Sequence, residues 1–531
     1  MEITGKQLIA GNWIAEGGQT FNAVNPSNSQ ALEPSIVEGT AAEVDRALSA
    51  ASEAFDDFRK LSFAQRADFL DAIADEIMEL GDALLERAGQ ETGLPAGRLT
   101  MERGRTVNQT RLFATVLREG SWVDARIDLP DPDRAPVPKP DVRRMLCPIG
   151  PVVVFGASNF PLAISVIGSD TVSALGSGCP VVVKGHPGHP GTCEMMAEAV
   201  RRAQEKCGVP AGAFSLVQGA GHEVGMALVN HSATEAVAFT GSLRGGRALF
   251  DAAAARPRPI PVYAEMGSVN PVFMLPGALA ARGEQIAEGF IQSLTLGVGQ
   301  FCTCPGMALG LRDQAFDAFV SKAKEAAAAS APATMLHPGI QKAYESGLAK
   351  LIESDGVSLA SRSETNVDPL KNEAGCHVFE TDAAALLANP ELFDENFGPS
   401  SLVVGGQSVG ELEAAAEKLE GNLTATIHGT PEDLKTHARL VSILERKVGR
   451  LIFNGFPTGL EVCAAMHHGG PYPATTHSHF TSVGTASIQR FVRPVCYQGF
   501  PQEALPDELK DENVRGIWRM IDGAISKENA R

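Results

Sequence analysis

Two stretches, PVVVF at residues 151–155 and VVVK at residues 181–184, decide the fold, because each contains a short β-branched run that precedes a segment with helical spacing. Alternation of such strands and helices is typical of a doubly wound α/β sheet. The alternation continues along the chain, with strands expected at residues 152–155, 181–184, 215–218 and 236–239 and helices at residues 165–175, 193–205, 223–229 and after Gly241.

Further elements are expected on both sides of this region. Residues 40–43 (TAAE) and 62–65 (SFAQ) fit the capping-box pattern, which predicts one helix after Thr40 and another after Ser62. Residues 124–144 are rich in Pro and Asp, and we interpret them as an excursion from the main domain. A second α/β region is expected after Glu265, with helices near residues 284–296 and 313–329 and a strand near residues 449–453.

The composition describes a large soluble protein. At 531 residues the chain exceeds the usual size of one core, so two or three domains are expected. Hydrophobic residues make up 44% and charged residues 20%, which is typical of neither a disordered chain nor a membrane protein. The formal charge of -18 argues against a nucleic-acid partner, because phosphate binding favours a basic surface. Nine scattered cysteines without paired metal-binding spacing fit a reducing cytoplasm.

Neither export nor membrane insertion is expected. Residues 1–6 contain an early acid and no apolar segment, unlike a signal peptide. Residues 146–183 carry Asp170 as their single charge, but prolines, glycines and Asn159 interrupt the apolar run. Buried parallel strands explain this stretch better than a membrane span.

Several strand ends could bind a cofactor. Lys184 ends the VVVK strand, where ligands bind in open α/β sheets. At residues 239–242 (FTGS) a strand leads into a glycine turn and a helix start, whose N–H groups can hold a phosphate. Each feature is by itself also consistent with a structural lysine or an ordinary turn. The glycines at residues 219–225 miss the dinucleotide fingerprint by one residue, so we interpret them as a turn, with His222 near the cofactor.

Three residues could carry covalent chemistry. Cys302, in GQFCTC at residues 299–304, is a candidate nucleophile, and Glu265 upstream could act as a base or activate water. Taken singly, Cys302 and Cys304 are typical of buried thiols, Glu265 of a solvated carboxylate, and Asn159 of a turn residue. The order in which they occur carries more information than each residue alone.

That order resembles the aldehyde dehydrogenase superfamily over nearly the whole chain. The matching features, in sequence order, are Asn159, Lys184, residues 240–242 (TGS), Glu265, residues 299–302 (GQFC) and residues 395–399 (ENFGP). The resemblance implies that Cys302 is the nucleophile, Glu265 the general base, and Asn159 an oxyanion donor together with the Cys302 N–H. The cofactor residues it implies are Lys184, His186, Pro187, Thr240, Gly241, Ser242, Gly246, Glu395 and Phe397.

The resemblance also implies the architecture. The fold class would be α/β, with two doubly wound domains and a small β oligomerisation arm. A dinucleotide-binding domain would comprise residues 1–123 and 145–264, and a catalytic domain residues 265–478. Residues 124–144 and 479–531 would form the arm and C-terminal segment. A homodimer or homotetramer is expected, since the superfamily assembles through this arm.

The sequence departs from the NAD-preferring pattern after Lys184. Many such members place an acidic residue three positions later, where it binds the adenosine 2′-hydroxyl; here that position is Pro187. A missing carboxylate removes repulsion toward a 2′-phosphate, and His186, His189 or His222 could add positive charge. NADP is therefore the predicted cofactor, with NAD possible as a second.

The C-terminal sequence resembles one branch of the superfamily. The matching stretches are HHGGPYPATT at residues 467–476, TSVGT at residues 481–485 and RFVRPV at residues 490–495. That branch holds α-ketoglutaric semialdehyde (2,5-dioxopentanoate) dehydrogenases and related NADP-using fatty aldehyde dehydrogenases. We favour the semialdehyde, which would be oxidised to 2-oxoglutarate. The alternatives are a broad or fatty aldehyde dehydrogenase and, more remotely, a member that kept the fold as an inactive binding or structural protein.

A dioxo acid requires a cation in its pocket. Arg103 and Arg105 lie on the stretch that borders the substrate tunnel in the superfamily, although surface or interdomain arginines would look the same in sequence. Phe160 and Phe301 are also expected at the substrate site. The histidines 467, 468, 477 and 479 lack a nearby set of Cys or carboxylate ligands in the sequence, so no metal site is predicted.

Overall fold

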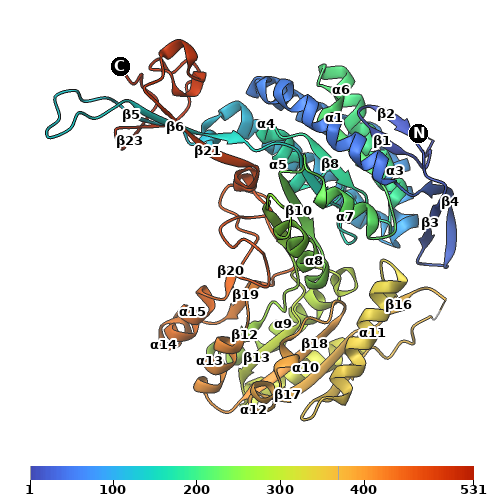
Figure 1. Ribbon diagram of the computed structural model, residues 1–531. Helices are drawn as coiled ribbons and strands as arrows, with labels where there is room; N and C mark the ends of the chain where they lie inside the picture. Colours follow the sequence, from blue (N-terminus) through green and yellow to red (C-terminus); the bar gives the residue numbers. More distant parts are fainter. Residues whose placement is uncertain (1, 369) are drawn as a thin grey trace.

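The computed structural model describes residues 2–368 and 370–531 and shows two α/β lobes with a projecting arm (Figure 1). The first lobe is built on a seven-stranded sheet in the order β11-β10-β7-β8-β9-β1-β2. Its strands are β1 (Gln7–Ile9), β2 (Asn12–Ile14), β7 (Val152–Phe155), β8 (Val181–Lys184), β9 (Phe214–Val217), β10 (Ala236–Thr240) and β11 (Val262–Glu265). Strands β7 to β11 are parallel, and β1 pairs with β9 and β2 in antiparallel fashion.

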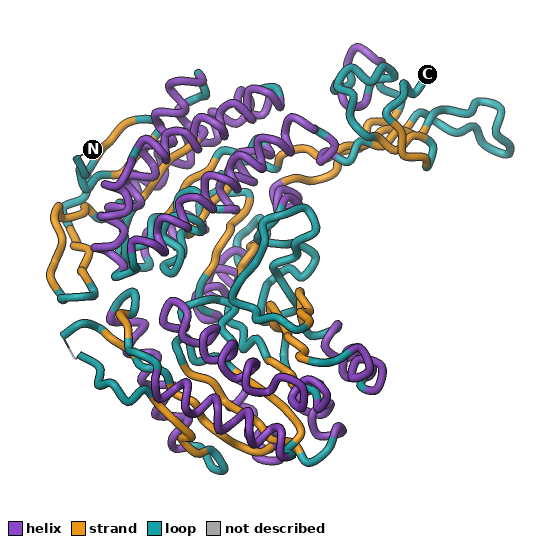
Figure 2. Tube along the Cα trace, turned by 180° about the vertical axis from the view of Figure 1, so that it is seen from behind, coloured by secondary structure: helices purple, strands orange, loops and turns teal. Residues whose placement is uncertain are grey.

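Helices cover both faces of this sheet, as the view from behind shows (Figure 2). They are α1 (Ala41–Lys60), α2 (Phe63–Glu79), α3 (Gly81–Thr92), α4 (Ala96–Glu119), α5 (Ser169–Ser177), α6 (Pro190–Cys207), α7 (Glu223–Asn230) and α8 (Leu243–Ala254). Alternate residues of each strand pack on opposite sides: Val181 and Val183 join one apolar core, and Val182 joins another with α1, α7 and α8. Burial on both faces explains why the strand sequences are continuously apolar.

The second lobe has its own seven-stranded sheet, in the order β15-β17-β18-β13-β12-β19-β20. Its strands are β12 (Val272–Met274), β13 (Met307–Leu311), β15 (Ser358–Arg362), β17 (His377–Asp382), β18 (Ser400–Gly406), β19 (Asn422–His428) and β20 (Val448–Phe453). All neighbours pair in parallel except β15 with β17. The helices are α9 (Pro276–Thr295), α10 (Gln314–Ala329), α11 (Pro338–Glu353), α12 (Ala383–Ala388), α13 (Val409–Lys418), α14 (Pro431–Thr436) and α15 (Ala438–Glu445).

The arm is a five-stranded sheet assembled from two distant parts of the chain. Its order is β21-β6-β5-β22-β23, with β5 (Arg126–Asp128), β6 (Val142–Pro148), β21 (Val492–Gln498), β22 (Arg519–Ile521) and β23 (Ala524–Ser526). The excursion predicted at residues 124–144 therefore pairs with the C-terminal segment, and both extend away from the lobes in Figure 1. Two small sheets, β3 (Thr20–Asn25) with β4 (Gln30–Val37) and β14 (Ala333–Thr334) with β16 (Glu373–Ala374), complete the strands.

Most expected elements are confirmed; the differences are shifted element ends and strands that were not predicted. The predicted capping boxes at Thr40 and Ser62 are present, with reciprocal hydrogen bonds to Glu43 and Gln65. Helix α5 begins at Ser169 rather than at residue 165, because residues 161–168 form turns. Helix α9 begins at Pro276, earlier than expected, and the β1–β2 hairpin was not predicted. Within the described ranges, no helix combines the length and apolar character that crossing a bilayer requires.

Candidate active site

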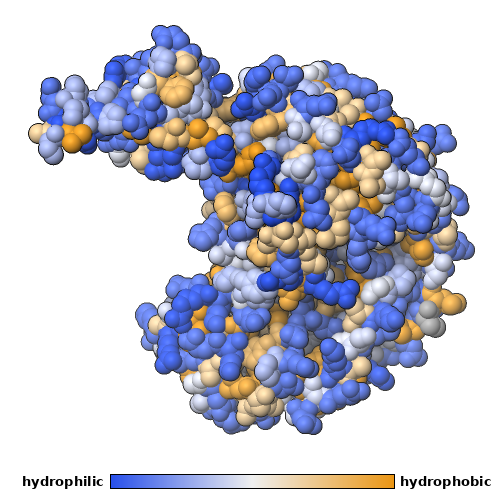
Figure 3. All heavy atoms as spheres, viewed as in Figure 1, coloured by the Kyte–Doolittle hydropathy of each residue, from blue (hydrophilic) through white to orange (hydrophobic). Residues whose placement is uncertain are grey.

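The carboxyl ends of the first sheet's central strands meet at one edge. Phe155 is in register with Lys184, and Thr240 with Glu265, so the segments that follow β7, β8, β10 and β11 lie side by side. This is the edge at which open α/β sheets bind ligands. The space-filling view shows the molecule hollowed between the two lobes (Figure 3).

The predicted nucleophile lies on an irregular segment between α9 and β13. Gly297, Val298 and Gly299 all have positive φ, which turns the chain sharply before Cys302. A Cβ on Gly299 would lie 2.3 Å from the carbonyl carbon of Gly398, so only glycine permits this approach to the loop before β18. The Asn270 amide then donates to the carbonyl oxygens of Cys302 (2.9 Å) and Cys304 (3.0 Å). The backbone of the nucleophile segment is thus held in place.

The two neighbouring cysteines differ in environment. Cys304 is buried in the apolar core of the second lobe, and burial raises the pKa of its thiol. Cys302 is half-buried and has polar neighbours. Its Sγ lies 3.5 Å from His468 Nε2, and the closest ligand atoms of Cys302, Glu265 and His468 all lie within 4.8 Å of one another. Cys302 is therefore the thiol that a small molecule can reach.

Glu265 is buried, and its two carboxylate oxygens have different neighbours. The Ser482 hydroxyl donates to Oε2, and Oε1 lies 3.2 Å from His468 Nε2. Burial opposes its ionisation, but His468 and Ser482 outweigh that effect and lower the pKa of Glu265. Burial and the adjacent Glu265 charge raise the pKa of Cys302 well above its usual value. At neutral pH the pair is therefore a carboxylate beside a neutral thiol.

His468 and Ser482 reach the site because the C-terminal chain pairs with β11. The Met266 N–H donates to Ala474 O (2.8 Å), and the Thr476 N–H donates to Ala264 O (3.1 Å). The sequence marked His468 within a group of histidines but gave no sign of its contact with Glu265, which is remote in the chain. Folding therefore supplies the carboxylate and cysteine neighbours that the local sequence lacks.

Asn159 lies against the nucleophile segment, as expected. Its Nδ2 donates to the carbonyl of Gln300 at 3.0 Å. The adjacent Phe160 packs edge-on against Phe301, with ring centroids 5.3 Å apart, so residues from the two lobes meet here. The structure thus brings together Asn159, Glu265, Cys302 and both phenylalanines.

The two predicted arginines have different surroundings. Arg103 donates to the carbonyl of Gly81 at 2.8 Å, within the helical part of the first lobe. Arg105 lies 5.3 Å above the Phe160 ring, and its buried Nε has no hydrogen-bond partner among the described residues. Burial lowers the pKa of Arg105, and the nearby Glu102, Cys302 and Glu265 act in the opposite direction. Arg105 therefore lies beside the phenylalanine pair next to the nucleophile, whereas Arg103 is bonded to Gly81.

Two further arginines near the phenylalanines or the nucleophile were missed. Arg98 lies over both Phe160 and Phe301, at 4.5 and 5.5 Å, and pairs with Glu102 at 2.5 Å. Arg450, on β20, donates to the carbonyls of Pro457 and Gly459. Helical spacing from Arg105 could have indicated Arg98; Arg450 had no local signal.

Lys184 is buried at the end of β8. Its Nζ donates to the carbonyl of Gly219 at 2.5 Å, and burial lowers its pKa to about 8. Gly219 lies in the turn between β9 and α7, and residues 223–225 already belong to α7, so residues 219–225 form the expected strand-to-helix turn and helix start. The structure also places Glu38 here: its carboxylate accepts from the Ala220 N–H at 2.9 Å. The local sequence gives no sign of this acidic neighbour, because Glu38 is remote from Lys184 in the chain.

The predicted Pro187 site lies beside a group of histidines. His186 stacks on His189, with ring centroids 5.2 Å apart, and approaches His337 of the second lobe at 6.1 Å. Burial lowers the pKa of His186 well below its usual value, and the neighbouring His189 adds to this effect. A neutral His186 can still donate or accept a hydrogen bond, but it adds little positive charge.

The turn after β10 presents a helix start to solvent. Thr240 and Gly241 end the strand, and Ser242 caps α8 by accepting from the Gly245 N–H at 3.2 Å. Gly246, in the same helix, packs closely against Met266, since a Cβ at this position would lie 2.6 Å from Met266 Sδ. The exposed first turn of this twelve-residue helix offers N–H groups to a phosphate, and Lys184 offers a donor to ribose hydroxyls. These residues fit a dinucleotide.

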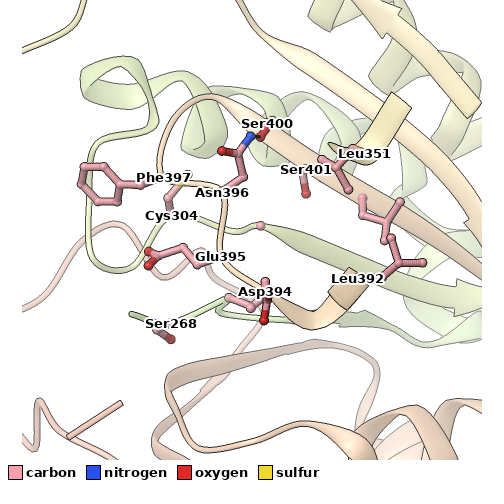
Figure 4. A pocket seen from close by; sticks show the side chains of 13 residues that line it. Ser268, Cys304, Leu351, Leu392, Asp394, Glu395, Asn396, Phe397, Ser400 and Ser401 are labelled. Carbon is pink, nitrogen blue, oxygen red and sulfur yellow. Dashed lines mark hydrogen bonds between the residues drawn. The ribbon is translucent and has the colours of Figure 1, made fainter. Parts of the chain in front are cut away.

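Glu395 and Phe397 lie on the loop before β18. Their side chains point the same way, to the left in Figure 4 and away from Leu351 and Leu392. Glu395 itself is exposed, so a ligand can reach its carboxylate. Glu395, Phe397 and Ser268 line one pocket, which Figure 4 shows from close by.

Comparisons with known proteins agree with this geometry. The aldehyde dehydrogenase family model matches residues 13–471. "Alpha-ketoglutaric semialdehyde dehydrogenase 2" of Azospirillum brasilense is 50% identical over 98% of this chain and 99% of its own, and "Alpha-ketoglutaric semialdehyde dehydrogenase" of Acinetobacter baylyi is 46% identical over 99% of each. A solved structure of betaine aldehyde dehydrogenase from Staphylococcus aureus superposes with a TM-score of 0.79 at 22% identity, covering 94% of this chain and 98% of that one. The chain therefore belongs to the aldehyde dehydrogenase family.

Proposed function

We propose that this protein oxidises an aldehyde to a carboxylic acid through a covalent intermediate on Cys302, and that the aldehyde is 2,5-dioxopentanoate, which yields 2-oxoglutarate. The observation that carries the chemistry is the half-buried Cys302 thiol beside the ionised, buried Glu265. The two relatives named for α-ketoglutaric semialdehyde support the choice of substrate.

Glu265 starts the reaction as a base. Because the Cys302 thiol is neutral, it needs a proton acceptor, and the Glu265 carboxylate lies within its reach. The thiolate then adds to the aldehyde carbon and forms a thiohemiacetal. A nicotinamide cofactor, when bound, supplies the hydride acceptor that converts this adduct into a thioester.

Asn159 and the Cys302 backbone stabilise the adduct. The Asn159 amide is already aimed at the nucleophile segment through its bond to Gln300 O. A small rotation of that amide toward the developing oxyanion, together with the Cys302 N–H, would provide two donors. Removing one such donor costs a factor of about 10² to 10³ in turnover.

Glu265 also completes the reaction. Once the proton taken from Cys302 has passed to solvent, the Glu265 carboxylate takes a proton from water, and the resulting hydroxide attacks the acyl carbon. When this adduct collapses, the Cys302 thiolate leaves and takes up the proton held by Glu265. The contact with Ser482 keeps the carboxylate oriented through both steps. Release of the acid regenerates the Cys302 thiol.

Arg105 is the residue we propose for the substrate carboxylate. It lies beside the phenylalanine pair next to the nucleophile, and its buried Nε has no partner within the described residues. A carboxylate at the far end of a five-carbon dioxo acid would supply that missing acceptor.

For the cofactor we propose NADP, with NAD as a weaker alternative. The support is Pro187, which replaces the acidic residue expected in NAD-preferring members. Lys184, Ser242 and Glu395 would hold the ribose and pyrophosphate groups, with Thr240, Gly241, Gly246, His186 and Phe397 shaping the site. Glu38 disfavours NADP relative to NAD, because its carboxylate lies near Lys184 and would repel a 2′-phosphate there.

The arm suggests self-association. Ile525 on β23 is 71% exposed and Trp518 beside β22 is 50% exposed, so the arm carries apolar surface that a second copy could cover. We propose a cytoplasmic homodimer or homotetramer formed through the arm. All nine cysteines are free thiols, which supports a reducing compartment.

An aldehyde panel assayed with both cofactors tests the function. We expect the highest kcat/KM for 2,5-dioxopentanoate with NADP, lower values for a short neutral aldehyde and a long-chain aldehyde, and no turnover in Cys302→Ala. Cys304→Ala is the matched control and should retain most activity, because Cys304 lies in the core. Full turnover by Cys302→Ala would overturn the mechanism; equal kcat/KM for decanal would favour the fatty aldehyde alternative.

A further inference from the structure

The contact of His468 with Cys302 and Glu265 has a second consequence. We propose that these three side chains form a binding site for a thiophilic divalent cation such as Zn²⁺, and that occupation of this site blocks the nucleophile. The inhibition rests on the proposed function, whereas the binding does not. The three ligand atoms are Cys302 Sγ, His468 Nε2 and one Glu265 oxygen.

Two of the three distances between these atoms match a tetrahedral zinc site. Zinc bonds of about 2.3 Å to sulfur and about 2.0 to 2.1 Å to nitrogen and oxygen require roughly 3.6 Å between S and N and about 3.4 Å between N and O. The structure has 3.5 Å between Cys302 Sγ and His468 Nε2, and 3.2 Å between His468 Nε2 and Glu265 Oε1. The third separation, between Cys302 Sγ and the Glu265 oxygen, lies within 4.8 Å and would close to about 3.6 Å on binding.

The Glu265 oxygen in this site is otherwise unused. Oε1 is buried, and the described residues give it no hydrogen bond of acceptable geometry, even though His468 Nε2 is close. A buried carboxylate oxygen without a partner has lost its hydrogen bonds to water and has gained none within the protein. A cation between Oε1, Nε2 and Sγ would satisfy it.

Contacts behind the site hold the Glu265 side chain and the backbones of Cys302 and His468. Ser482 donates to the second oxygen of Glu265, and Asn270 donates to the Cys302 carbonyl. The His468 backbone is fixed by its N–H bond to Thr481 Oγ1 at 2.8 Å. Outer contacts of this kind raise metal affinity by orienting the ligands in advance.

Binding would balance as a simple proton exchange. The Cys302 S–H bond breaks, an S–Zn bond forms, and the proton leaves to solvent, while His468 and Glu265 donate lone pairs. Three protein ligands leave a fourth position for water, on the side where Cys302 is half-exposed. The sulfur lone pair that would attack the aldehyde is then engaged by the metal.

Direct metal binding tests the site independently of activity. Metal-free protein would be titrated with Co²⁺ under a non-chelating reductant, then back-titrated with Zn²⁺. We expect one site per chain with thiolate-to-cobalt absorption, abolished by Cys302→Ala, weakened at least about tenfold by His468→Gln, and retained by His467→Gln and Cys304→Ala.

Alkylation supplies a second readout. Zn²⁺ should protect Cys302 from iodoacetamide, measured on its peptide, while the exposed Cys207 stays reactive. One-site binding that survives Cys302→Ala, or equal affinity in His468→Gln, would overturn the site. Protection of Cys302 without loss of turnover would instead contradict Cys302 as the nucleophile and leave the cation site standing.

Discussion

Asp170 and Arg490 form a buried ion pair, with Oδ1 and Nη1 2.7 Å apart and side chains 8% and 3% exposed. Asp170 is the single charged residue of the apolar stretch at residues 146–183, and Arg490 belongs to the C-terminal segment that continues into the arm. Arg490 also donates to the carbonyl of Ser487 at 3.1 Å. The pair therefore attaches the C-terminal segment to helix α5.

Removing one partner should destabilise the protein strongly. Asp170→Ala leaves Arg490 buried and uncompensated, which costs about 3 to 5 kcal/mol. We expect a clear fall in the urea midpoint, partly restored in Asp170→Ala/Arg490→Met because no charge is then stranded. The control is Asp75→Ala, which breaks an exposed pair with Arg111 and should cost no more than about 1 kcal/mol. A double variant as unstable as the single one would contradict this explanation.

Arg105 should matter only for substrates with a carboxylate. Its loss removes a charge-assisted hydrogen bond of about 1.5 to 3 kcal/mol, so Arg105→Met should raise KM for 2,5-dioxopentanoate about 10- to 100-fold and leave propanal nearly unchanged. Arg103→Met is the matched control, because Arg103 donates to Gly81 O instead. An unchanged KM for the dioxo acid in Arg105→Met would remove this residue from substrate binding.

The first lobe could be predicted well because its signals are local. Val181 to Lys184 and Ala236 to Phe239 are apolar on both faces, and Ser62 with Gln65 is a complete capping box. The strand-end rule located Lys184 but neither Glu265, which ends the unpredicted strand β11, nor Cys302, which lies before the amino end of β13 in the second sheet. His468 and Arg450 depend on pairings with distant strands, and no spacing in the sequence reveals such contacts.

The cofactor preference should follow two carboxylate positions. Pro187→Glu would add a charge beside the adenosine ribose, so we expect kcat/KM with NADP to fall at least about tenfold relative to NAD. Glu38→Gln should have the opposite effect, since it removes a carboxylate near Lys184 while its side chain can still accept from the Ala220 N–H. Steady-state kinetics with both cofactors measure the ratio. A strong NAD preference in the unmodified protein would refute the inference from Pro187.

Lys184 should make stability depend on pH in a defined window. Burial lowers its pKa from 10.5 to about 8, so between these values the unfolded chain binds the proton that the folded chain has lost. Stability conferred by this group therefore rises with pH across that window, by up to about 1.4 kcal/mol per pH unit, and is flat below it.

Lys184→Met keeps the side-chain volume and removes the titration. Between about pH 7.5 and about pH 9.5, the urea midpoint of the unmodified protein should therefore rise relative to that of Lys184→Met. The control is Lys435→Met, at a 75% exposed lysine, whose urea midpoint should change with pH as that of the unmodified protein does. Parallel pH curves for the unmodified protein and Lys184→Met would show that Lys184 is solvated, and would weaken its proposed place in the dinucleotide site.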